Sequence, residues 1–284
     1  MPLTQRAPAK INLGLHVLRK RPDGYHDVET VLHRIDWADT ITAAPAKTLS
    51  LTCSDPALPT NTDNLCLQAA HQLASAFDVT EGADLHLDKQ VPYGAGLGSG
   101  SSDAAATLRL LTRLWDLAPT PEQLREIGEE LGSDVPFFLM DVPAAYATGR
   151  GEMLSPLLKD GNPYRLPYPL LIAVPSVEIA TPWAYAEVTP SNANRPTLRR
   201  IVSSNDLARW RSDLANDFEA PVAEAEPSVA SVRDALRGTD AAYVSLTGSG
   251  GAVYGVFETV EDAQEAQETL QIPQVRTHLM EVHG

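Results

Sequence analysis

Cysteine is scarce in this sequence. Only two of the 284 residues are cysteines, Cys53 and Cys66, and they do not form a Cys-x-x-Cys pair. A disulfide framework or a cysteine metal site would need more cysteines or a closer spacing. We therefore expect two reduced thiols, as is typical of a cytoplasmic protein.

Positive charge and long apolar runs are scarce as well. The chain has 22 lysines and arginines against 37 aspartates and glutamates, so its formal net charge is −15. Phosphate backbones and anionic lipid headgroups repel such a chain, which argues against nucleic acid or an anionic membrane as its main partner. No apolar run reaches the length of a membrane span, and no signal-peptide pattern is visible. The 284 residues, 43% of them hydrophobic, instead predict a folded chain with room for two domains.

Three common motifs are also missing. There is no G-x-x-x-x-G-K-[ST], which argues against a Walker-type nucleotide site. The glycines of residues 94–103 place serine or aspartate where G-x-G-x-x-G needs its last glycine, which argues against a dinucleotide-binding domain. The absence of G-x-S-x-G argues against an esterase.

Residues 92–105 carry the most informative signal. Four glycines fall within seven residues, at positions 94, 96, 98 and 100, and Ser101 and Ser102 open a helical pattern that runs to about Leu117. Glycines let backbone N–H groups face inward, and a helix start adds free donors and the positive end of its dipole. The segment therefore predicts a cradle for phosphates. The alternative is a flexible surface loop before an ordinary helix, but linkers seldom combine glycines, a leucine and a double serine in this way.

Hydrophobic periodicity predicts an α+β protein of two domains, 1–156 and 157–284, divided at the proline- and glycine-rich stretch 157–167. In the first domain, strands are expected at 8–18, 26–36, 39–44, 49–53 and 84–90, and helices at 63–77, from the glycine loop to about 117, and at 120–132. In the second, strands are expected at 170–174, 242–246, 252–257 and 275–282, helices at 181–188, 227–236 and 260–270, and a loop at 191–200. The second set indicates an antiparallel sheet layered with helices.

The glycine segment resembles the phosphate loop of the GHMP kinases, a family named for galactokinase, homoserine kinase, mevalonate kinase and phosphomevalonate kinase. The shared pattern is Pro-x-Gly-x-Gly-Leu-Gly followed by Ser-Ser. Further segments fit one branch of that family, and the resemblance spans nearly the whole chain. They are Pro8-Ala9-Lys10-Ile11-Asn12, Asp23-Gly24-Tyr25-His26 and Leu246-Thr247-Gly248-Ser249-Gly250-Gly251.

This resemblance implies a two-domain GHMP kinase fold, with an N-terminal ribosomal-protein-S5-like domain that binds ATP and a C-terminal ferredoxin-like α/β sandwich. It implies an ATP-dependent kinase that phosphorylates the 2-hydroxyl of 4-diphosphocytidyl-2-C-methyl-D-erythritol, in the non-mevalonate (methylerythritol phosphate) isoprenoid pathway. Mg²⁺ would accompany ATP without a dedicated protein site, since no dense carboxylate cluster is evident. We expect the three glycine-containing segments to converge at one cleft between the domains.

The resemblance makes Asp134 and Lys10 the catalytic pair. Asp134 lies between a glycine turn and an apolar run, so we expect it to be partly buried. The resemblance assigns it as the base that accepts the hydroxyl proton, whereas a helix-cap aspartate is the alternative. Lys10 would lie beside it, hold it ionised and steady the charge on the transferring phosphoryl group. By sequence alone, Lys10 reads more readily as a solvated lysine at a strand end.

The resemblance also makes Tyr25 and His26 part of a cytosine clamp, with Tyr25 stacked on the ring and His26 reading its polar edge. The alternative is a hairpin with an aromatic ring on the sheet. Tyr185 would cover the other face of the base and Thr181 would lie by the ribose or erythritol. Asn12 and Gly248 are further substrate contacts that the resemblance implies.

For ATP, the resemblance implies contacts by Asn64, Lys89, Pro92, Tyr93, Gly94, Ala95, Gly96, Leu97, Gly98, Ser99, Gly100, Ser101 and Ser102. Asn64 and Lys89 are also ordinary residues for a helix start and a strand end. Ser101 and Ser102 can offer hydroxyls to phosphate or Mg²⁺, and one of them can cap the helix. The pattern departs from the family at Ser99, where glycine is usual, and at Leu32, where an aromatic is frequent. Serine would be strained if position 99 needed a positive φ.

Two other functions remain open from the sequence. A GHMP kinase acting on homoserine or mevalonate would have no use for a cytidine clamp, so Tyr25 and His26 favour the cytidyl substrate. A non-catalytic nucleotide-binding module on the same fold would need no base, so Lys10 and Asp134 together favour catalysis.

Overall fold

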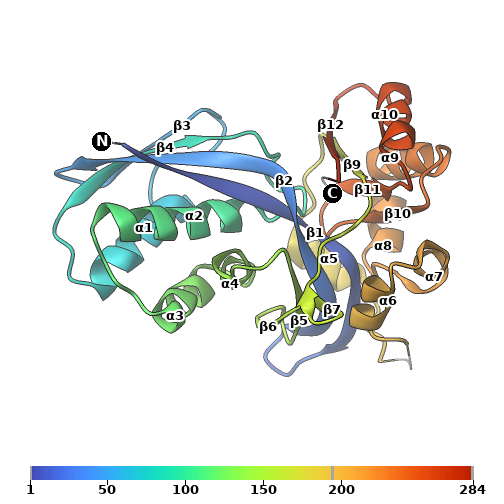
Figure 1. Cartoon of the computed structure of the whole chain (residues 1–284), viewed down its shortest axis with the longest axis horizontal. Coiled ribbons are helices and arrows are strands. Elements are labelled where there is room, and N and C mark those ends of the chain that lie inside the picture. The colour runs from blue at the N-terminus through green and yellow to red at the C-terminus, as the bar shows by residue number, and fades with distance from the viewer. Residues whose placement is uncertain (1, 193–194, 283–284) are drawn as a thin grey trace. The chain divides into compact units, whose positions relative to one another are not determined.

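Two long strands, β1 (Leu3–Lys20) and β2 (His26–Ala46), run through the structure, a computed structural model that describes residues 2–192 and 195–282 (Figure 1). Both strands contribute residues to each of two compact units. The first unit comprises Met1–Ala9, Asp36–Pro92 and Gly98–Asp141, and the second comprises Lys10–Ile35, Tyr93–Leu97 and Val142–Gly284. These units are interleaved along the chain, so they differ from the sequential domains 1–156 and 157–284, which stay a prediction.

In the first unit, the second half of β2 pairs with β4 (Gly82–Asp88), and β4 pairs in parallel with β3 (Ser50–Cys53). The predicted strands 26–36 and 39–44 are thus one continuous strand. Buried Ile35, Trp37, Asp39 and Ile41 alternate with more exposed residues across the predicted break, so nothing interrupts the period of two.

Four helices complete the first unit: α1 (Leu65–Ala76), α2 (Ser99–Leu114), α3 (Pro121–Leu131) and α4 (Val135–Leu139). The predicted start of α3 is confirmed, because Thr120 and Gln123 form a capping box and Pro121 occupies the first turn. Helix α2 ends three residues before the predicted Leu117, with Trp115 as its C-cap. Its buried Leu108 and Leu111 face the core as expected.

In the second unit, the first half of β2 pairs with β5 (Ala144–Thr148), which pairs with β6 (Met153–Pro156). A short hairpin of β7 (Leu158–Lys159) and β8 (Asn162–Pro163) occupies the predicted domain boundary. A separate sheet has the order β10-β11-β9-β12, and every pairing in it is antiparallel, as predicted. Its strands are β9 (Leu170–Pro175), β10 (Tyr243–Leu246), β11 (Val253–Val256) and β12 (Val275–Met280).

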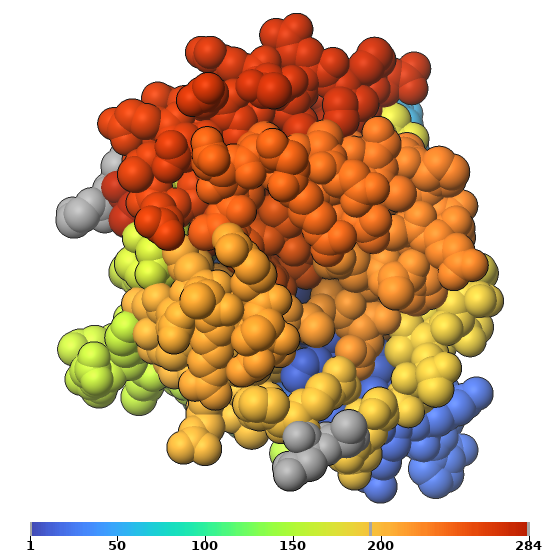
Figure 2. Space-filling model, turned by 90° about the vertical axis from the view of Figure 1, so that its right-hand side faces the viewer, coloured from blue at the N-terminus to red at the C-terminus, as the bar shows by residue number. Residues whose placement is uncertain are grey.

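The helices of the second unit are α5 (Thr181–Glu187), α6 (Leu198–Ser204), α7 (Leu207–Asp213), α8 (Glu219–Ala225), α9 (Pro227–Arg237) and α10 (Val260–Thr269). Apolar residues of α8, α9 and α10 share one core with β9 and β11. In Figure 2 the orange and red residues of these helices fill much of the face that is turned to the reader. Helices α6, α7 and α8 were not predicted. The predicted loop 191–200 is wrong from Leu198 onward, because α6 begins there. Residues 193–194 of that loop lie outside the described residues.

Within residues 2–192 and 195–282, no helix combines the length and apolar character needed to cross a bilayer.

Candidate active site

The glycine segment is a packed loop, not a flexible linker. Ala95 and Leu97 are buried, and Gly94, Gly96 and Gly98 have φ values of 72°, 84° and 66°, a region that favours glycine. Ser99 is the first residue of α2 and is not among the positive-φ residues, so the strain considered for serine at this position does not arise. The glycines therefore stand at the positions where the backbone needs them.

The loop packs against the glycine segment near the carboxyl end. The Ala252 N–H donates to the Ala95 carbonyl oxygen at 3.0 Å. A Cβ added to Gly96 would lie 2.3 Å from the Thr247 carbonyl oxygen, and one added to Gly250 would lie 2.3 Å from the Gly96 nitrogen. Two of the three glycine-containing segments thus meet backbone to backbone, at a distance that only glycine permits.

Helix α2 offers its amino end directly after the loop. Gly98 is its N-cap in a left-handed conformation and supplies no side chain, so the first N–H groups of α2 keep their capacity to bind an anion. The Ser102 hydroxyl donates to the Pro8 carbonyl oxygen at 2.7 Å, which commits it to a structural contact. The Ser101 hydroxyl lies on the turn before α4, since a Cβ added to Gly132 would be 3.9 Å from its Oγ.

Lys10 is buried, with 4% of its surface exposed. The alternative of a solvated lysine at a strand end is therefore wrong. Its ammonium donates to Asn12 Oδ1 at 2.7 Å and to the Gly96 carbonyl oxygen at 2.9 Å. Its backbone N–H donates to the Leu97 carbonyl oxygen at 3.0 Å. A buried ammonium needs such oxygen partners, and the glycine loop supplies one of them, the Gly96 carbonyl oxygen.

Asn12 is the centre of a buried network that fixes Lys10. Its side-chain amide donates to Thr30 Oγ1 at 2.9 Å, and its backbone N–H donates to Thr247 Oγ1 at 2.9 Å. The Tyr254 hydroxyl donates to the Asn12 carbonyl oxygen at 3.1 Å. The contacts of Asn12 in this structure are therefore with the protein, and its predicted contact with the substrate stays a prediction.

Asp134 lies in the first unit, half-buried as predicted, directly before α4. It has helical dihedral angles, φ −87° and ψ −16°, and its side chain makes no capping hydrogen bond to α4. The alternative of a helix-cap aspartate therefore lacks its defining contact. The carboxylate is positioned by the Gly132 turn, whose carbonyl oxygen accepts from the Val135 N–H at 3.1 Å.

Two of the three aromatic residues of the predicted clamp lie together in the second unit. The His26 and Tyr185 rings stack with centroids 4.9 Å apart and an interplanar angle of 18°. Tyr25 follows a turn at Gly24 and is 58% exposed, and the Arg150 guanidinium carbon lies 5.0 Å from the centroid of its ring. Burial and the charge of Lys20 lower the pKa of His26 from its ordinary value, which favours a neutral imidazole.

Two residues in this region were missed by sequence reasoning. Arg150 stands between two glycines in a β-turn, a pattern that gives no hint of a partner ring. Asn216 is buried and its amide donates to the carbonyl oxygens of Leu246 and Gly248, both at 2.9 Å. Thr181 contacts the same segment through a 3.1 Å hydrogen bond with Ser249. Asn216 and Thr181 thus fix the path of the Gly248 segment.

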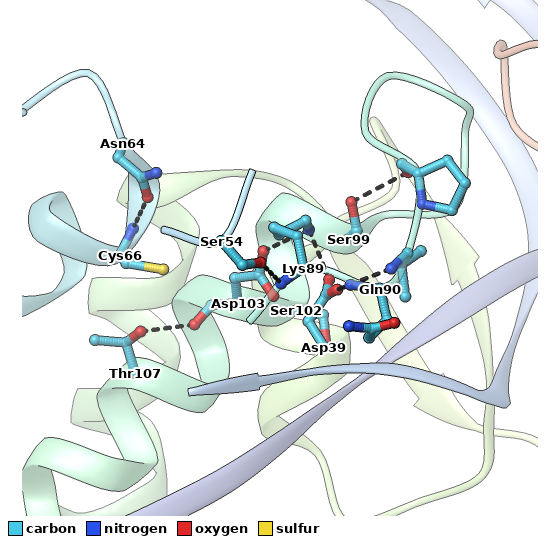
Figure 3. A network of polar contacts seen from close by, with 12 residues as sticks. Asp39, Ser54, Asn64, Cys66, Lys89, Gln90, Ser99, Ser102, Asp103 and Thr107 are labelled. Carbon is cyan, nitrogen blue, oxygen red and sulfur yellow. Dashed lines mark hydrogen bonds and ion pairs between the residues drawn. The ribbon is translucent and has the colours of Figure 1, made fainter. Parts of the chain in front are cut away.

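The remaining predicted residues have structural partners. Asn64 caps α1, accepting from the Cys66 N–H at 2.9 Å. Lys89 is buried and ion-paired with Asp39 at 2.6 Å and Asp103 at 2.9 Å (Figure 3). Direct contacts of Asn64 and Lys89 with ATP stay predictions.

Leu32 is buried, with 2% of its surface exposed. Among the residues that the structure describes, no group of three or more histidine, cysteine, aspartate or glutamate side chains could hold a metal ion.

Comparison with known proteins defines the class of this chain. Residues 64–149 match the N-terminal domain of the GHMP kinases, and residues 195–274 match the GHMP kinase C-terminal domain. A 4-diphosphocytidyl-2-C-methyl-D-erythritol kinase of Salinibacter ruber is 73% identical over 280 residues, 99% of each chain. One of Chlorobium limicola is 41% identical and covers 94% of this chain and 92% of its own. The chain belongs to the 4-diphosphocytidyl-2-C-methyl-D-erythritol kinases of the GHMP kinase family.

Solved structures agree with this assignment. A crystal structure of 4-(cytidine 5'-diphospho)-2C-methyl-D-erythritol kinase matches with a TM-score of 0.81 and 32% identity, covering 98% of each chain. A homoserine kinase from Cytophaga hutchinsonii matches with a TM-score of 0.74 at 17% identity, covering 99% of this chain and 95% of its own, and so shares the fold. The predicted GHMP kinase fold is thereby confirmed.

The contact of Gly96 with Thr247 can be tested against a matched glycine. Gly96 and Gly24 have similar φ values, 84° and 87°, but a Cβ on Gly24 would meet nothing within 4 Å. Gly24→Ala should lower the free energy of unfolding by about 1–2 kcal/mol, the cost of a left-handed alanine. Gly96→Ala should cost about 1–3 kcal/mol more, because the added carbon collides with backbone. Urea unfolding of both variants measures the difference, and equal losses would contradict the packing described here.

Proposed function

We propose that this kinase transfers the γ-phosphoryl group of ATP to the 2-hydroxyl of 4-diphosphocytidyl-2-C-methyl-D-erythritol. The oxygen of that hydroxyl forms the new P–O bond, the bond between the γ-phosphorus and the β,γ-bridging oxygen breaks, and ADP leaves. The observation that carries the proposal is the 73% identity, over 99% of both chains, to a relative named for this substrate. The reaction would serve the non-mevalonate isoprenoid pathway in the cytoplasm, with no nucleic-acid or membrane partner.

ATP would bind with its phosphates on the glycine loop and the first residues of α2, which together span residues 92–102. The supporting feature is a set of backbone N–H groups at the start of α2 beside three positive-φ glycines. Asn64 would lie near the adenine and Lys89 near the nucleotide. Because the protein carries a net charge of −15, these local donors must outweigh an unfavourable overall field, which salt screens beyond about 10 Å.

Mg²⁺ fits this arrangement as a companion of ATP. The Ser101 hydroxyl next to the Gly132 turn supplies an oxygen donor of the kind that Mg²⁺ prefers, and few protein donors suffice when phosphates and water complete the shell. When bound, the ion would neutralise charge on the phosphates.

Asp134 would act as the base and Lys10 as its electrostatic partner. A half-buried carboxylate at the start of α4 is suited to accept the proton of the 2-hydroxyl. The buried ammonium of Lys10, tied to the Gly96 carbonyl oxygen, would steady charge on the phosphoryl group in transfer.

The cytosine would be held by Tyr25, His26 and Tyr185. Tyr25 offers an exposed ring for stacking, and a neutral His26 can both donate to and accept from the polar edge of the base. Thr181, Asn12 and Gly248 would line the path of the ribose, diphosphate and erythritol.

A substrate panel tests the function as a whole. ADP release would be measured with the cytidyl substrate, homoserine and mevalonate side by side at equal concentration. Only the cytidyl substrate should support turnover. Turnover with homoserine or mevalonate alone would overturn the proposal in favour of another GHMP kinase, and absence of turnover with all three would favour a nucleotide-binding module.

Asp134→Asn should lower kcat by about 10²–10⁴-fold, the usual cost of losing a general base, while both KM values change little. The free energy of unfolding should stay close to that of the parent, because asparagine has the same shape as aspartate and this position is only half-buried. Asp141→Asn, an exposed aspartate of the same unit, is the control. A kcat within a few-fold of the parent would remove Asp134 from the role of base.

Tyr25→Ala should weaken the binding of the cytidyl substrate by the free energy of one stacking contact, about 1–3 kcal/mol. The KM for ATP should stay unchanged. Tyr93→Ala is a matched control, since Tyr93 is 61% exposed and lies in the glycine loop. It should leave the KM for the cytidyl substrate unchanged. If Tyr25→Ala raised both KM values equally, the clamp would be misplaced.

A further inference from the structure

A buried ion triad stands at the base of the glycine loop. The Lys89 ammonium lies 2.6 Å from Asp39 Oδ2 and 2.9 Å from Asp103 Oδ2. The exposed fractions of the three side chains are 0% for Asp39 and 4% for each of the other two. Figure 3 shows them pointing toward one another from β2, from the end of β4 and from α2. All three belong to the first unit.

The triad joins the two ends of the loop. Asp39 Oδ1 accepts the N–H groups of Gln90 at 2.5 Å and Val91 at 2.8 Å, the last two residues before Pro92. Asp103 lies in α2, five residues after Gly98, where the loop ends. Lys89 bridges the two carboxylates. The side chains therefore tie the incoming strand to the outgoing helix and fix the span across which the loop must close.

Two carboxylates and one ammonium leave a net charge of −1 when all three are ionised. The two carboxylates raise the pKa of Lys89 in spite of its burial, so the ammonium stays charged. Burial, with the charge of Asp39, raises the pKa of Asp103 to about 7 against the opposing effect of Lys89. Asp103 Oδ1 is also buried without a hydrogen-bond partner in the described part of the chain. The triad thus gains or loses one proton close to neutral pH.

The cysteines and hydroxyls next to the triad do not change charge in that range. Cys66 and Cys53 lie close enough to act on it electrostatically, and burial raises the pKa of Cys66 to about 12 and that of Cys53 above its ordinary value. The hydroxyls of Ser54 and Thr107 contact backbone atoms of Lys89 and Asp103 and carry no charge.

We propose that Asp39, Lys89 and Asp103 are positioning residues for ATP, which hold the phosphate loop in its binding conformation and tune its affinity through the net charge of the triad. This rests on the proposed function in one respect, that the loop receives the phosphates of ATP. When Asp103 loses its proton, a negative charge forms at the base of a loop that binds an anion. ATP affinity should therefore fall as pH rises through about 7.

The experiment measures ATP binding to the full chain by calorimetry, without the second substrate, between about pH 6 and pH 9. Asp103→Asn is isosteric and neutral, so it mimics the protonated triad and should fold. Its Kd for ATP should vary less with pH than that of the parent; the ionisation of ATP itself is common to both proteins and cancels in the comparison. An identical pH dependence would overturn the electrostatic part of the proposal.

Asp39→Asn tests the positioning. It turns an amide toward Lys89 and should raise the Kd for ATP by about tenfold or more, while the Kd for the cytidyl substrate stays within about twofold. Asp217→Asn is the matched control, because Asp217 also accepts a backbone N–H, that of Val17 at 2.8 Å, and pairs with Arg195 at 2.7 Å. Equal effects of both substitutions on ATP binding would reduce the triad to a general stabilising contact and overturn the proposal.

The two proposals fail in different ways. A parent protein that binds ATP but does not phosphorylate the cytidyl substrate would overturn the proposed function and leave the triad measurements valid. A parent protein that does not bind ATP would overturn both.

Discussion

The site depends on the burial of the Lys10 ammonium. A charge with 4% exposure must be surrounded by oxygen atoms, because an unpaired ammonium in a protein interior is costly. Two of these atoms are Asn12 Oδ1 and the Gly96 carbonyl oxygen. To present that carbonyl, the loop must turn at Gly96 with a φ of 84° and pack against Thr247. One buried charge thus ties together segments from the beginning, the middle and the end of the chain.

The distribution of charge explains how an acidic kinase can work with anionic ligands. Lys89 precedes the phosphate loop, but two carboxylates offset its charge, so it stabilises the frame of the loop more than it attracts phosphate. In the proposed complex the attraction would come from backbone N–H groups and the dipole of α2, which carry no net charge and need no counter-ion. The proposed base-binding region likewise offers rings and a guanidinium, with Arg150 placed over Tyr25.

Much of the fold could be predicted from local patterns, and the helices that were missed depend on tertiary contacts. The capping box at Thr120 and the antiparallel sheet of the second unit were predictable, because capping residues and periodicity are local signals. Helices α6, α7 and α8 have seven residues each, too few to be stable alone or to show a clear period. They exist through tertiary contacts such as the fully buried Trp210, whose indole N–H donates to the Ile201 carbonyl oxygen at 2.9 Å.

The sequence by itself determined where the backbone of the phosphate loop can turn and which family the chain resembles, since the spacing of glycines acts within a few residues. It also placed Lys10 and Asp134 in recognisable motifs. Only the tertiary structure decided that Lys10 is buried, that Asn216 holds the Gly248 segment, and that Asp39 pairs with Lys89 and the backbone before the glycine loop. In sequence, Asp39 is an ordinary aspartate on a strand, 50 residues away from Lys89. Its role arises because strand pairing and helix packing bring distant residues together, and burial then makes their charges interact strongly.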